Sequence, residues 1–537
     1  MVSHRLRAPS ADGSLLAEPP LIAASARLAE NASQLGNWQY EFQGRSASRL
    51  RTLVRKQVIE KAKSFLNNAG LAFPEPGTGE RLVVTGHQPE LFHPGVWVKN
   101  FAAFEIAKQS RGVGLNLVVD NDLPKSNGIK VPVRQREGLH VERVLFDEWG
   151  GEIPYEDLRV SDESLFATFP ERVHDVFAGD RSGMVLDSFW KHAVQFRGLT
   201  DRLGLRLSLA RRAVEGSWGV RNLEVPLSAV CETEGFQWFA AHLLAHLPRY
   251  QDIHNDALQR YRELYGIRSR HHPVAALGRD GDWLEAPFWA WREGAPRRRP
   301  LLARQRGELL DLRIGGEAEP FLELPLGPDR EACCAVEELQ ALPMRGIRLR
   351  TRALTTTMFS RYLLGDLFLH GIGGAKYDEL GDEISGRFFG MTPPDYLTMS
   401  MTLWLGLGEA AGSTEGLNRV DRRLRDLSFN PEREVKSLAE GDGAEWVGKK
   451  RTAIAGPVET HFQRLERFQE IRRCNEALQA LVKGRQEELV EHRAKLRAAV
   501  ARNALAQSRE YAFVLHSETR LRTALRRVIP GLSLEAE

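Results

Sequence analysis

Two histidines, a glutamine and a lysine follow the first run of the chain that has the pattern of a strand. The apolar run RLVV begins at Arg81, the turn TGHQPELFHP comes next, and a helical pattern extends from Gly95 to Ser110. The residues of this turn and of the helix start that could do chemistry are Gly86, His87, Gln88, His93 and Lys99. Such side chains transfer protons or stabilise negative charge, so the turn is either the border of an active site or a well-capped connection.

Two carboxylates follow a second run of this kind. The stretch GLNLVVDNDLP is typical of a strand that ends in Asp120, Asn121 and Asp122. Either carboxylate could act as a general base or bind an amine, and we expect Asp120 to matter more because it is nearer the strand end. The two share a face if the strand persists, because side chains alternate along a strand, whereas a turn at Asn121 breaks that relation.

A glycine-rich segment follows a third run. We expect a strand over Leu367–His370, a tight loop over Gly371–Gly374 and a helix over Ala375–Phe389. The candidate residues of this segment are His370, Gly371, Gly373, Gly374, Lys376, Tyr377 and Asp378. Glycine permits close backbone approach and a helix N-terminus attracts anions, so a phosphate or a carboxylate could dock here. The alternative is a tight turn followed by favourable first-turn acids.

Neither a nucleotide motif nor a metal motif accompanies these residues. The segment HGIGGAKYDE matches neither G-x-x-x-x-G-K-[ST] nor G-x-G-x-x-G, so the cofactor is unknown, with a nucleotide such as ATP as one candidate. His87, His93, Asp120 and Asp122 are of metal-ligand types, but H-E-x-x-H and C-x-x-C spacings are absent. A histidine near a turn is more often a hydrogen-bonding structural residue, so we assign no metal.

The order strand, helix, strand predicts an α/β fold with a parallel, Rossmann-like sheet and right-handed crossovers. In such sheets ligands bind beyond the carboxyl ends of the strands, so we expect the three turns to converge there. The predicted parts are a helical segment 1–72, an α/β core 73–395 with inserted helical and mixed segments at about 146–340, a linker and helical region 396–457, and a coiled-coil-like helical domain 458–528.

The last helical region carries an apolar seam among many charges. Its members recur at steps of three, four and seven: Phe468, Ile471, Leu478, Val482, Leu489, Leu496 and Val500. This spacing predicts a coiled coil that pairs two subunits, or equally a long amphipathic hairpin that packs on its own chain. We favour a homodimer through these C-terminal helices.

The composition excludes several classes of protein. A net charge of +3 from 74 basic and 71 acidic residues indicates no nucleic-acid partner, and we interpret Arg297–Arg299 as a solvated loop. No apolar run reaches the roughly 20 residues of a membrane span, and the N-terminal stretch lacks the apolar core of a secretory signal. Four cysteines are too few for a disulfide scaffold, so we expect a reduced, cytoplasmic protein. The aromatic stretch DWLEAPFWAWRE is expected in a core or a domain interface.

Two separated stretches resemble one enzyme family. VVTGHQPELFHPGVWVKNFAAFEIAK resembles the strand–TGQQAGLFTGP–helix opening of the cysteine-adding enzymes of bacillithiol biosynthesis, and LRTRALTTTMFSRYLLGDLFLHGIGGAKYDEL is similar to their block with the loop YVGGPGEIAYW. DNDLPKSNG stands where the family has EDHDFEEVN. The likeness covers roughly a quarter of the chain. Gly86, Gln88 and Gly374 match by position, whereas His87, His93 and Lys376 depart from the family's residues.

The resemblance implies a Rossmann-like core, a coiled coil involved in dimerisation, and a ligase that joins L-cysteine to the amino group of glucosaminyl malate. In that reaction Asp120 or Asp122 would take a proton, and His87, Lys99 or Lys376 would stabilise the oxyanion. The glycine segment would hold a phosphate or a malate-like carboxylate.

Two rival functions stay open. GHQP with a downstream histidine and lysine also resembles the WbqC-like proteins of polysaccharide clusters, which suggests another sugar-modifying transferase. A non-catalytic assembly protein acting through its coiled coil is the second rival.

Overall fold

The structure, a computed structural model, describes residues 6–74, 81–136, 138–268, 274–408 and 412–534. The chain forms two compact units, of which the first comprises residues 1–131, 142–405 and 509–537. The second comprises residues 132–141 and 406–508. Both units draw on segments that are far apart in the sequence.

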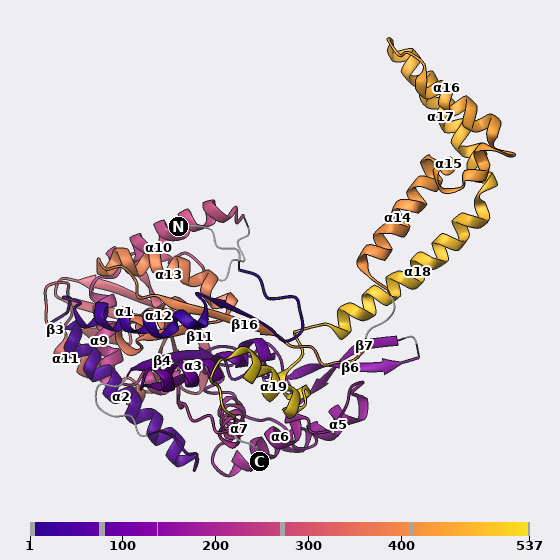
Figure 1. Ribbon diagram of the computed structural model, residues 1–537. Coiled ribbons are helices and arrows are strands. Elements are labelled where there is room, and N and C mark those ends of the chain that lie inside the picture. The colour runs from indigo at the N-terminus through magenta and orange to yellow at the C-terminus, as the bar shows by residue number, and fades with distance from the viewer. Residues whose placement is uncertain (1–5, 75–80, 137, 269–273, 409–411, 535–537) are drawn as a thin grey trace. The chain divides into compact units, whose positions relative to one another are not determined.

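A six-stranded sheet, in the order β1-β16-β15-β4-β5-β8, is the centre of the first unit (Figure 1). Its strands are β1 (Ser14–Glu18), β4 (Leu82–His87), β5 (Val113–Val118), β8 (Leu223–Pro226), β15 (Leu367–His370) and β16 (Tyr396–Thr402). β1 runs antiparallel to β16, and all other neighbours pair in parallel. The predicted α/β class with a largely parallel sheet is therefore confirmed.

The helix after β4 is buried on almost every side. α3 (Pro94–Gln109) begins with proline at its first position, and the His93 side chain accepts a hydrogen bond from the Gly95 N–H. α3 packs along β4, β5 and β16 and buries Trp97, Phe101 and other residues all round its surface. A helix enclosed in this way shows no amphipathic stripe, and any polar residue on it must find a partner inside the protein.

The segment expected to be helical up to residue 72 contributes a strand as well. α1 (Ala24–Gly36) and α2 (Ala47–Asn68) are helices as predicted, and α2 buries Val54, Val58 and Leu66 in the main core. β1, however, pairs with β16 at the edge of the central sheet. β1 has only five residues and no local periodicity that predicts a strand, and its partner strand lies almost 400 positions away in the sequence.

The glycine segment is helical rather than a loop. α13 (Ile372–Phe389) begins three residues earlier than expected, with Gly371 as its N-cap in an extended conformation. Gly373 and Gly374 therefore lie in the first helical turn, although isolated glycines disfavour helix. The predicted tight loop over Gly371–Gly374 is wrong, whereas the strand over Leu367–His370 is confirmed.

A second sheet, in the order β13-β12-β11-β10-β14, forms in the inserted segment. Its strands are β9 (Arg279–Asp280), which pairs with β10, then β10 (Trp283–Arg292), β11 (Ala295–Arg306), β12 (Leu309–Ile314), β13 (Leu322–Leu324) and β14 (Ile347–Thr351). The aromatic stretch lies on β10 and buries Trp283, Phe288 and Trp291, as expected. The arginine run belongs to β11, so the predicted loop is wrong, whereas Arg297 and Arg299 are exposed as expected.

The first unit also contains other α-helices, a π-helical turn and two short strands outside the two sheets. They are α4 (Glu163–Ala167), α5 (Phe169–Val176), α6 (Val185–Gln195), α7 (Leu203–Ser217), α8 (Leu227–Val230), α9 (Glu234–Ala245), α10 (Leu247–Tyr265), α11 (Cys333–Gln340), α12 (Ala353–Phe359), the π-helical turn η4 (Ser360–Leu364) and α19 (Glu518–Val528), with the short strands β2 (Glu41–Phe42) and β3 (Arg45–Ser46). A hairpin of β6 (Gly128–Gln135) and β7 (Gly138–Leu145) spans the boundary between the units.

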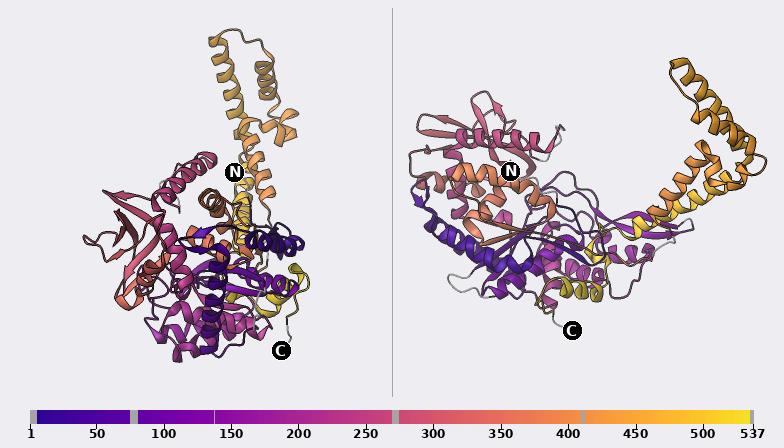
Figure 2. Two further views of the ribbon diagram at one scale, coloured as in Figure 1. Left: turned by 90° about the vertical axis from the view of Figure 1, so that its left-hand side faces the viewer. Right: turned by 45° about the horizontal axis from the view of Figure 1, so that its top comes forward.

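The second unit is built mainly from helices that lie alongside one another. α17 (His461–Leu481) is followed directly by α18 (Lys483–Ala506). α16 (Ala444–Ala455) packs on α17, and α14 (Thr414–Phe429) packs on α18 (Figures 1 and 2). The short α15 (Pro431–Glu434) contacts both α14 and α17. Seam residues Leu478, Val482 and Leu489 are buried in this unit's own core. Phe468, another seam residue, is 60% exposed. Intramolecular packing thus accounts for the middle of the seam.

None of the helices in the described ranges is both long enough and apolar enough to cross a membrane.

The packing of the second unit predicts a sharp difference between two leucines of α17. Leu478 is fully buried, so Leu478→Ala should lower the free energy of unfolding by about 2–5 kcal/mol through lost burial and an unfilled cavity. Leu481→Ala is the matched control, because that side chain is 48% exposed. Urea denaturation followed by circular dichroism measures both variants. Equal, small losses would show that α16 and α17 do not pack as described.

Candidate active site at the carboxyl ends of β4 and β15

The pairing of β15 with β4 brings the first and third turns to the same edge of the sheet. Leu369 pairs with Thr85 in parallel register, and the Thr85 hydroxyl donates to the Leu369 carbonyl oxygen at 3.1 Å. His370 therefore stands beside Gly86 at the strand ends. His87, the next residue of β4, projects to the opposite face because strand side chains alternate.

Lys99 is a buried cation at these strand ends. Its side chain reaches from α3, its Nζ donates to the Gly86 carbonyl oxygen at 2.9 Å, and the residue is 3% exposed. Within the described ranges, no carboxylate forms an ion pair with it. Burial lowers the pKa of Lys99 to about 8. A buried charge without a counter-ion is costly and is therefore rare unless it serves a function.

His87 is held in its neutral form. Burial, and secondly the charge of Lys99, lowers the pKa of His87 to about 3. Its Nδ1 lies 3.1 Å from the Gln88 carbonyl oxygen, and its ring packs edge-on against Phe92. The cavity that His87 lines with Asn116 and Arg211 has a volume of about 10 Å³, which is room for one water molecule and not for a substrate.

His370 is oriented by a buried carboxylate. Its Nε2 lies 2.7 Å from Asp378 Oδ2, and Asp378 also accepts hydrogen bonds from the Arg361 guanidinium at 2.7 Å and the Thr357 hydroxyl at 2.6 Å. Burial alone would raise the pKa of Asp378, but His370 and Arg361 hold it well below its usual range. Burial lowers the pKa of His370 against the pull of Asp378. A carboxylate that fixes a histidine ring in this way is a common support for catalysis.

The first turn of α13 packs closely against His370. A side chain at Gly374 would place its Cβ 2.8 Å from His370 Nδ1, so only glycine permits this approach. Positions 371 and 373 face open space, with nothing within 4 Å of a Cβ built there. The first-turn N–H groups of a helix have no partners within the helix, so they suit an anion.

Lys376 and Tyr377 lie further along α13. Lys376 is exposed, and its backbone carbonyl oxygen accepts a hydrogen bond from the Tyr261 hydroxyl at 3.0 Å. Tyr377 is half-buried, and burial raises its pKa. The described contacts connect neither side chain with Lys99 or His370.

Asp120 binds the backbone and side chain of Ser228, at the start of α8 directly after β8. Its Oδ1 accepts from the Ser228 N–H at 2.8 Å and its Oδ2 from the Ser228 hydroxyl at 2.5 Å, with the residue 1% exposed. Burial and the nearby Glu156 raise its pKa to about 7. A pKa near neutrality suits a general base, but both oxygens are engaged with Ser228, so the geometry fits a positioning residue better.

Asp122 points away from Asp120 toward the second sheet. It accepts hydrogen bonds from Gln88 Nε2 at 2.7 Å and from Arg298 Nη1 at 2.8 Å. Between them, the Asn121 amide donates to the Thr351 carbonyl oxygen at 2.9 Å. β5 ends at Val118, so Asp120 and Asn121 lie in a turn after the strand and the two carboxylates have separate partners.

His93 caps α3 and lies near the returning C-terminal segment. Its Nδ1 accepts from the Gly95 N–H at 3.1 Å and stands 3.5 Å from Arg509 Nη2. Burial lowers the pKa of His93 to about 4. Within the described ranges, no group of three or more histidine, cysteine or acidic residues is arranged to hold a metal ion.

The partners that orient these residues were missed in the sequence. Thr357, Arg361 and Ser228 come from segments far along the chain, and no local pattern distinguishes them. Arg298 could have been identified from the sequence, because it belongs to the arginine run, but we predicted that this run forms a solvated loop. Its position on β11 brings it to Asp122.

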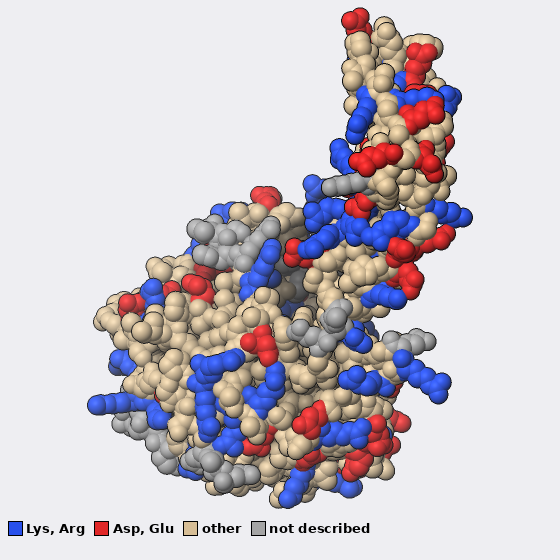
Figure 3. All heavy atoms as spheres, turned by 45° about the vertical axis from the view of Figure 1, so that its right-hand side comes forward, with Lys and Arg blue, Asp and Glu red and all other residues tan. Residues whose placement is uncertain are grey.

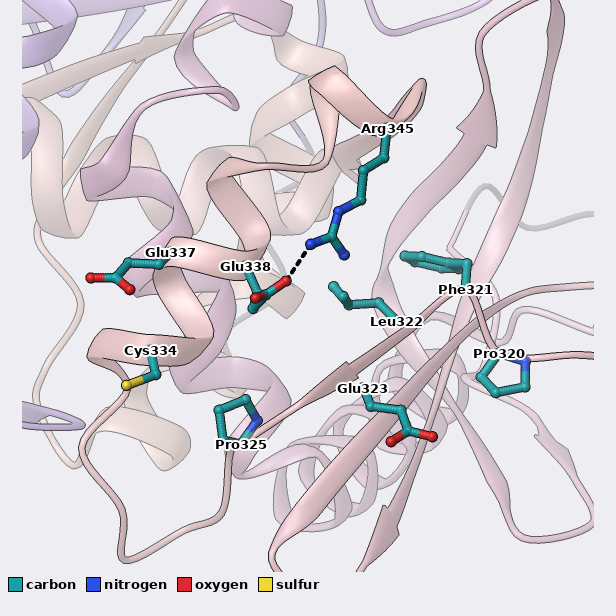
Figure 4. Close-up of a pocket in the computed structure, with 9 residues that line it drawn as sticks. All are labelled: Pro320, Phe321, Leu322, Glu323, Pro325, Cys334, Glu337, Glu338 and Arg345. Atoms are coloured by element: carbon teal, nitrogen blue, oxygen red, sulfur yellow. Dashed lines mark hydrogen bonds and ion pairs between the residues drawn. The ribbon is translucent and has the colours of Figure 1, made fainter.

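Another pocket, of about 450 Å³, lies by the start of α11 and β13 and holds none of the predicted residues (Figure 4). Cys334, Glu323 and Glu337 line it, and Arg345 pairs with Glu338 at 2.5 Å. Its three carboxylates, Glu323, Glu337 and Glu338, outnumber its one arginine and would repel an anionic substrate, so we do not place the site there.

The buried charge of Lys99 predicts a distinctive dependence of stability on pH. The pKa of about 8 in the folded protein lies below the ordinary value of 10.5, so the wild-type protein loses stability as pH falls from 10.5 to 8. Lys99→Met removes the ionisable group and with it this pH dependence. The free energy of unfolding of the variant minus that of the wild type should therefore fall by about 3 kcal/mol as the pH rises from 8 to 10.5. Urea denaturation over this range measures it, with Lys108→Met on the same helix, 56% exposed, as control. A constant difference would show that Lys99 is solvated.

Comparison with known proteins adds no family to this geometry. No family model matches the chain, and no curated protein matches it. What the site can do is therefore argued from its own residues.

Proposed function

We propose that this protein is an enzyme that binds a small anionic substrate at the carboxyl ends of β4 and β15. The observation that carries this proposal is Lys99, a buried ammonium group with a backbone carbonyl as its only described partner. The open start of α13 beside His370 adds a second attraction for an anion. Together they offer two separate donors to a carboxylate or a phosphate.

The reaction that we propose is the formation of an amide bond between L-cysteine and the amino group of an amino-sugar conjugate such as glucosaminyl malate. The motif resemblance supports this choice, as does a largely parallel sheet with its polar turns at one edge, the arrangement of a Rossmann-like core. In the reaction the amine attacks the carboxyl carbon of cysteine, and the carboxyl oxygen leaves in an activated form. A nucleotide such as ATP is the proposed source of activation.

Each group has a task in this scheme. Lys99 and the α13 N-terminus hold the malate-like carboxylate or stabilise the oxyanion of the tetrahedral intermediate. His370, fixed by Asp378, accepts the proton that the attacking amine loses. Asp120 holds the β8 turn in place through Ser228 and does not touch the reacting atoms.

A reaction assay with a matched pair of lysine variants tests the proposal. Purified protein is incubated with cysteine, glucosaminyl malate and ATP, and the amide product is quantified by mass spectrometry. Lys99→Met should lower turnover by about 10²–10³-fold, the usual effect of removing one donor to a developing charge, while circular dichroism stays unchanged. Lys108→Met should keep full turnover. Product formation that survives Lys99→Met would remove Lys99 from the mechanism, and no product with the wild type would refute the ligase.

We further propose that the second unit pairs two copies of the chain through a coiled coil on α17. Phe462, Leu465 and Phe468 are 66%, 47% and 60% exposed and recur every three residues, so they form one apolar stripe. Acidic and basic side chains are interspersed over the helices of this unit (Figure 3). Mixed charges flanking an apolar stripe suit pairing with an identical helix, because arginines of one copy can face glutamates of the other.

Light scattering at micromolar concentration tests this pairing. The wild type should be a dimer, and Phe468→Glu should be a monomer because a carboxylate replaces an aromatic ring of the stripe. Phe429→Glu is the matched control, since Phe429 on α14 is also 60% exposed and lies off the stripe. A wild-type protein that is monomeric at these concentrations would rule the dimer out.

A further inference from the structure

A cavity of about 860 Å³ opens in the first unit, away from the residues of the candidate active site. It lies between the junction of α9 with α10 and the strands β9 to β12 of the second sheet (α9, α10 and β11 in Figure 1). Leu244, Leu247, Leu284 and Leu310 give it an apolar lining. Its volume and lining are those of sites for small organic molecules.

The polar side of this cavity is strongly basic. Arg249, Arg279, Arg304 and Arg306 line it together with His246, and Asp282 is the acidic residue among the lining side chains. Arg304 and Arg306 are both paired with Asp311, at 2.9 and 2.7 Å. Within the described ranges, Arg249 and Arg279 have no carboxylate partner.

These two arginines make only neutral contacts. Arg249 donates to the Phe388 carbonyl oxygen at 2.9 Å, and Arg279 Nε donates to Gln251 Oε1 at 3.2 Å. Each guanidinium has five N–H donors in a planar fork, so each keeps donors for a bidentate anion.

A glutamine at the turn between β2 and β3 holds the walls of the cavity together. Gln43 has a left-handed backbone with φ of 47°, which is unusual for a residue other than glycine. Its Nε2 donates to the carbonyl oxygens of Gly327 and Pro328 at 3.0 and 2.8 Å, and also to that of Arg330. Its Oε1 faces His242 Nδ1 and His246 Nε2, both at 3.0 Å.

This network decides which histidine nitrogens carry protons. Because Gln43 Oε1 can only accept, His242 Nδ1 and His246 Nε2 must both be N–H donors. Gln43 thereby ties the His246 wall to the Pro328 wall, and both residues line the cavity. The positive φ of Gln43 belongs to the two-residue turn Gln43-Gly44 between β2 and β3, in which both residues have positive φ.

We propose that this cavity binds a small phosphate ester whose other end is apolar or aromatic. Arg249 and Arg279 take the phosphate oxygens, and the leucine lining takes the organic part. Arginine suits phosphate because its fork matches two oxygens at once. The proposal does not rest on the reaction assigned to the candidate active site.

Isothermal titration of the full-length protein tests it with adenosine monophosphate, glucose 6-phosphate and inorganic phosphate at constant ionic strength. Adenosine monophosphate should bind in a saturable way, and more tightly than glucose 6-phosphate and inorganic phosphate. Tighter binding of the nucleotide supports a ligand whose other end is aromatic. Tighter binding of the sugar phosphate, or no saturable binding of the nucleotide, overturns the proposal.

Variants of exposed arginines locate the binding. Arg279→Gln should weaken the ester's binding about tenfold, the loss expected for one charged hydrogen-bonding partner, with an unchanged melting temperature because Arg279 is exposed. Arg260→Gln on α10, 47% exposed and outside the cavity lining, is the matched control and should bind like the wild type. Unchanged binding in both Arg279→Gln and Arg249→Gln would overturn the proposal, as would loss of binding in Lys99→Met alone.

Discussion

The parallel pairing of β15 with β4 is the constraint on which the rest of the site depends. It joins Leu369 to Thr85 across 284 positions of sequence and so places His370 beside Gly86. A shift of one residue would turn His370 to the other face of the sheet and away from Asp378. Leu82 and Val84 of β4 pack with Phe368 of β15 in one apolar core, and this shared packing favours the register.

The edge created by this pairing concentrates charges that are costly to bury. Asp378 is compensated by Arg361 and His370, and its cluster is satisfied almost entirely by protein groups. Lys99 is different, since its partner is a neutral carbonyl oxygen and burial has moved its pKa toward neutrality. A protein that retains such a charge sacrifices stability, and anion binding at that place is the physical reason that we infer.

The arginines that line the cavity show the same contrast between paired and unpaired charges. Arg304 and Arg306 are neutralised by Asp311, whereas Arg249 and Arg279 face the cavity with neutral partners. The candidate active site and the cavity thus both contain positive charges without a carboxylate partner in the described residues, namely Lys99 in the first and Arg249 and Arg279 in the second. The apolar seam of the second unit likewise contains both satisfied and unsatisfied residues. Neighbouring helices cover Leu478, whereas Phe468 is exposed to solvent.

The sequence by itself determined the class of fold and the local elements around the site. Alternating short apolar runs and helical patterns identified β4, α3, β5 and β15 because these elements are specified by residues close together in the chain. It also marked His87, Asp120 and His370 as polar residues at strand ends, and Lys99 in the helix that follows the first of these strands. The tertiary structure alone decided their partners, namely Ser228 for Asp120, Arg298 for Asp122, and Asp378 with Arg361 for His370. Those contacts depend on strand order, register and the burial of each side chain, which are settled by packing between distant segments, and the same holds for β1 and for the helical start of α13.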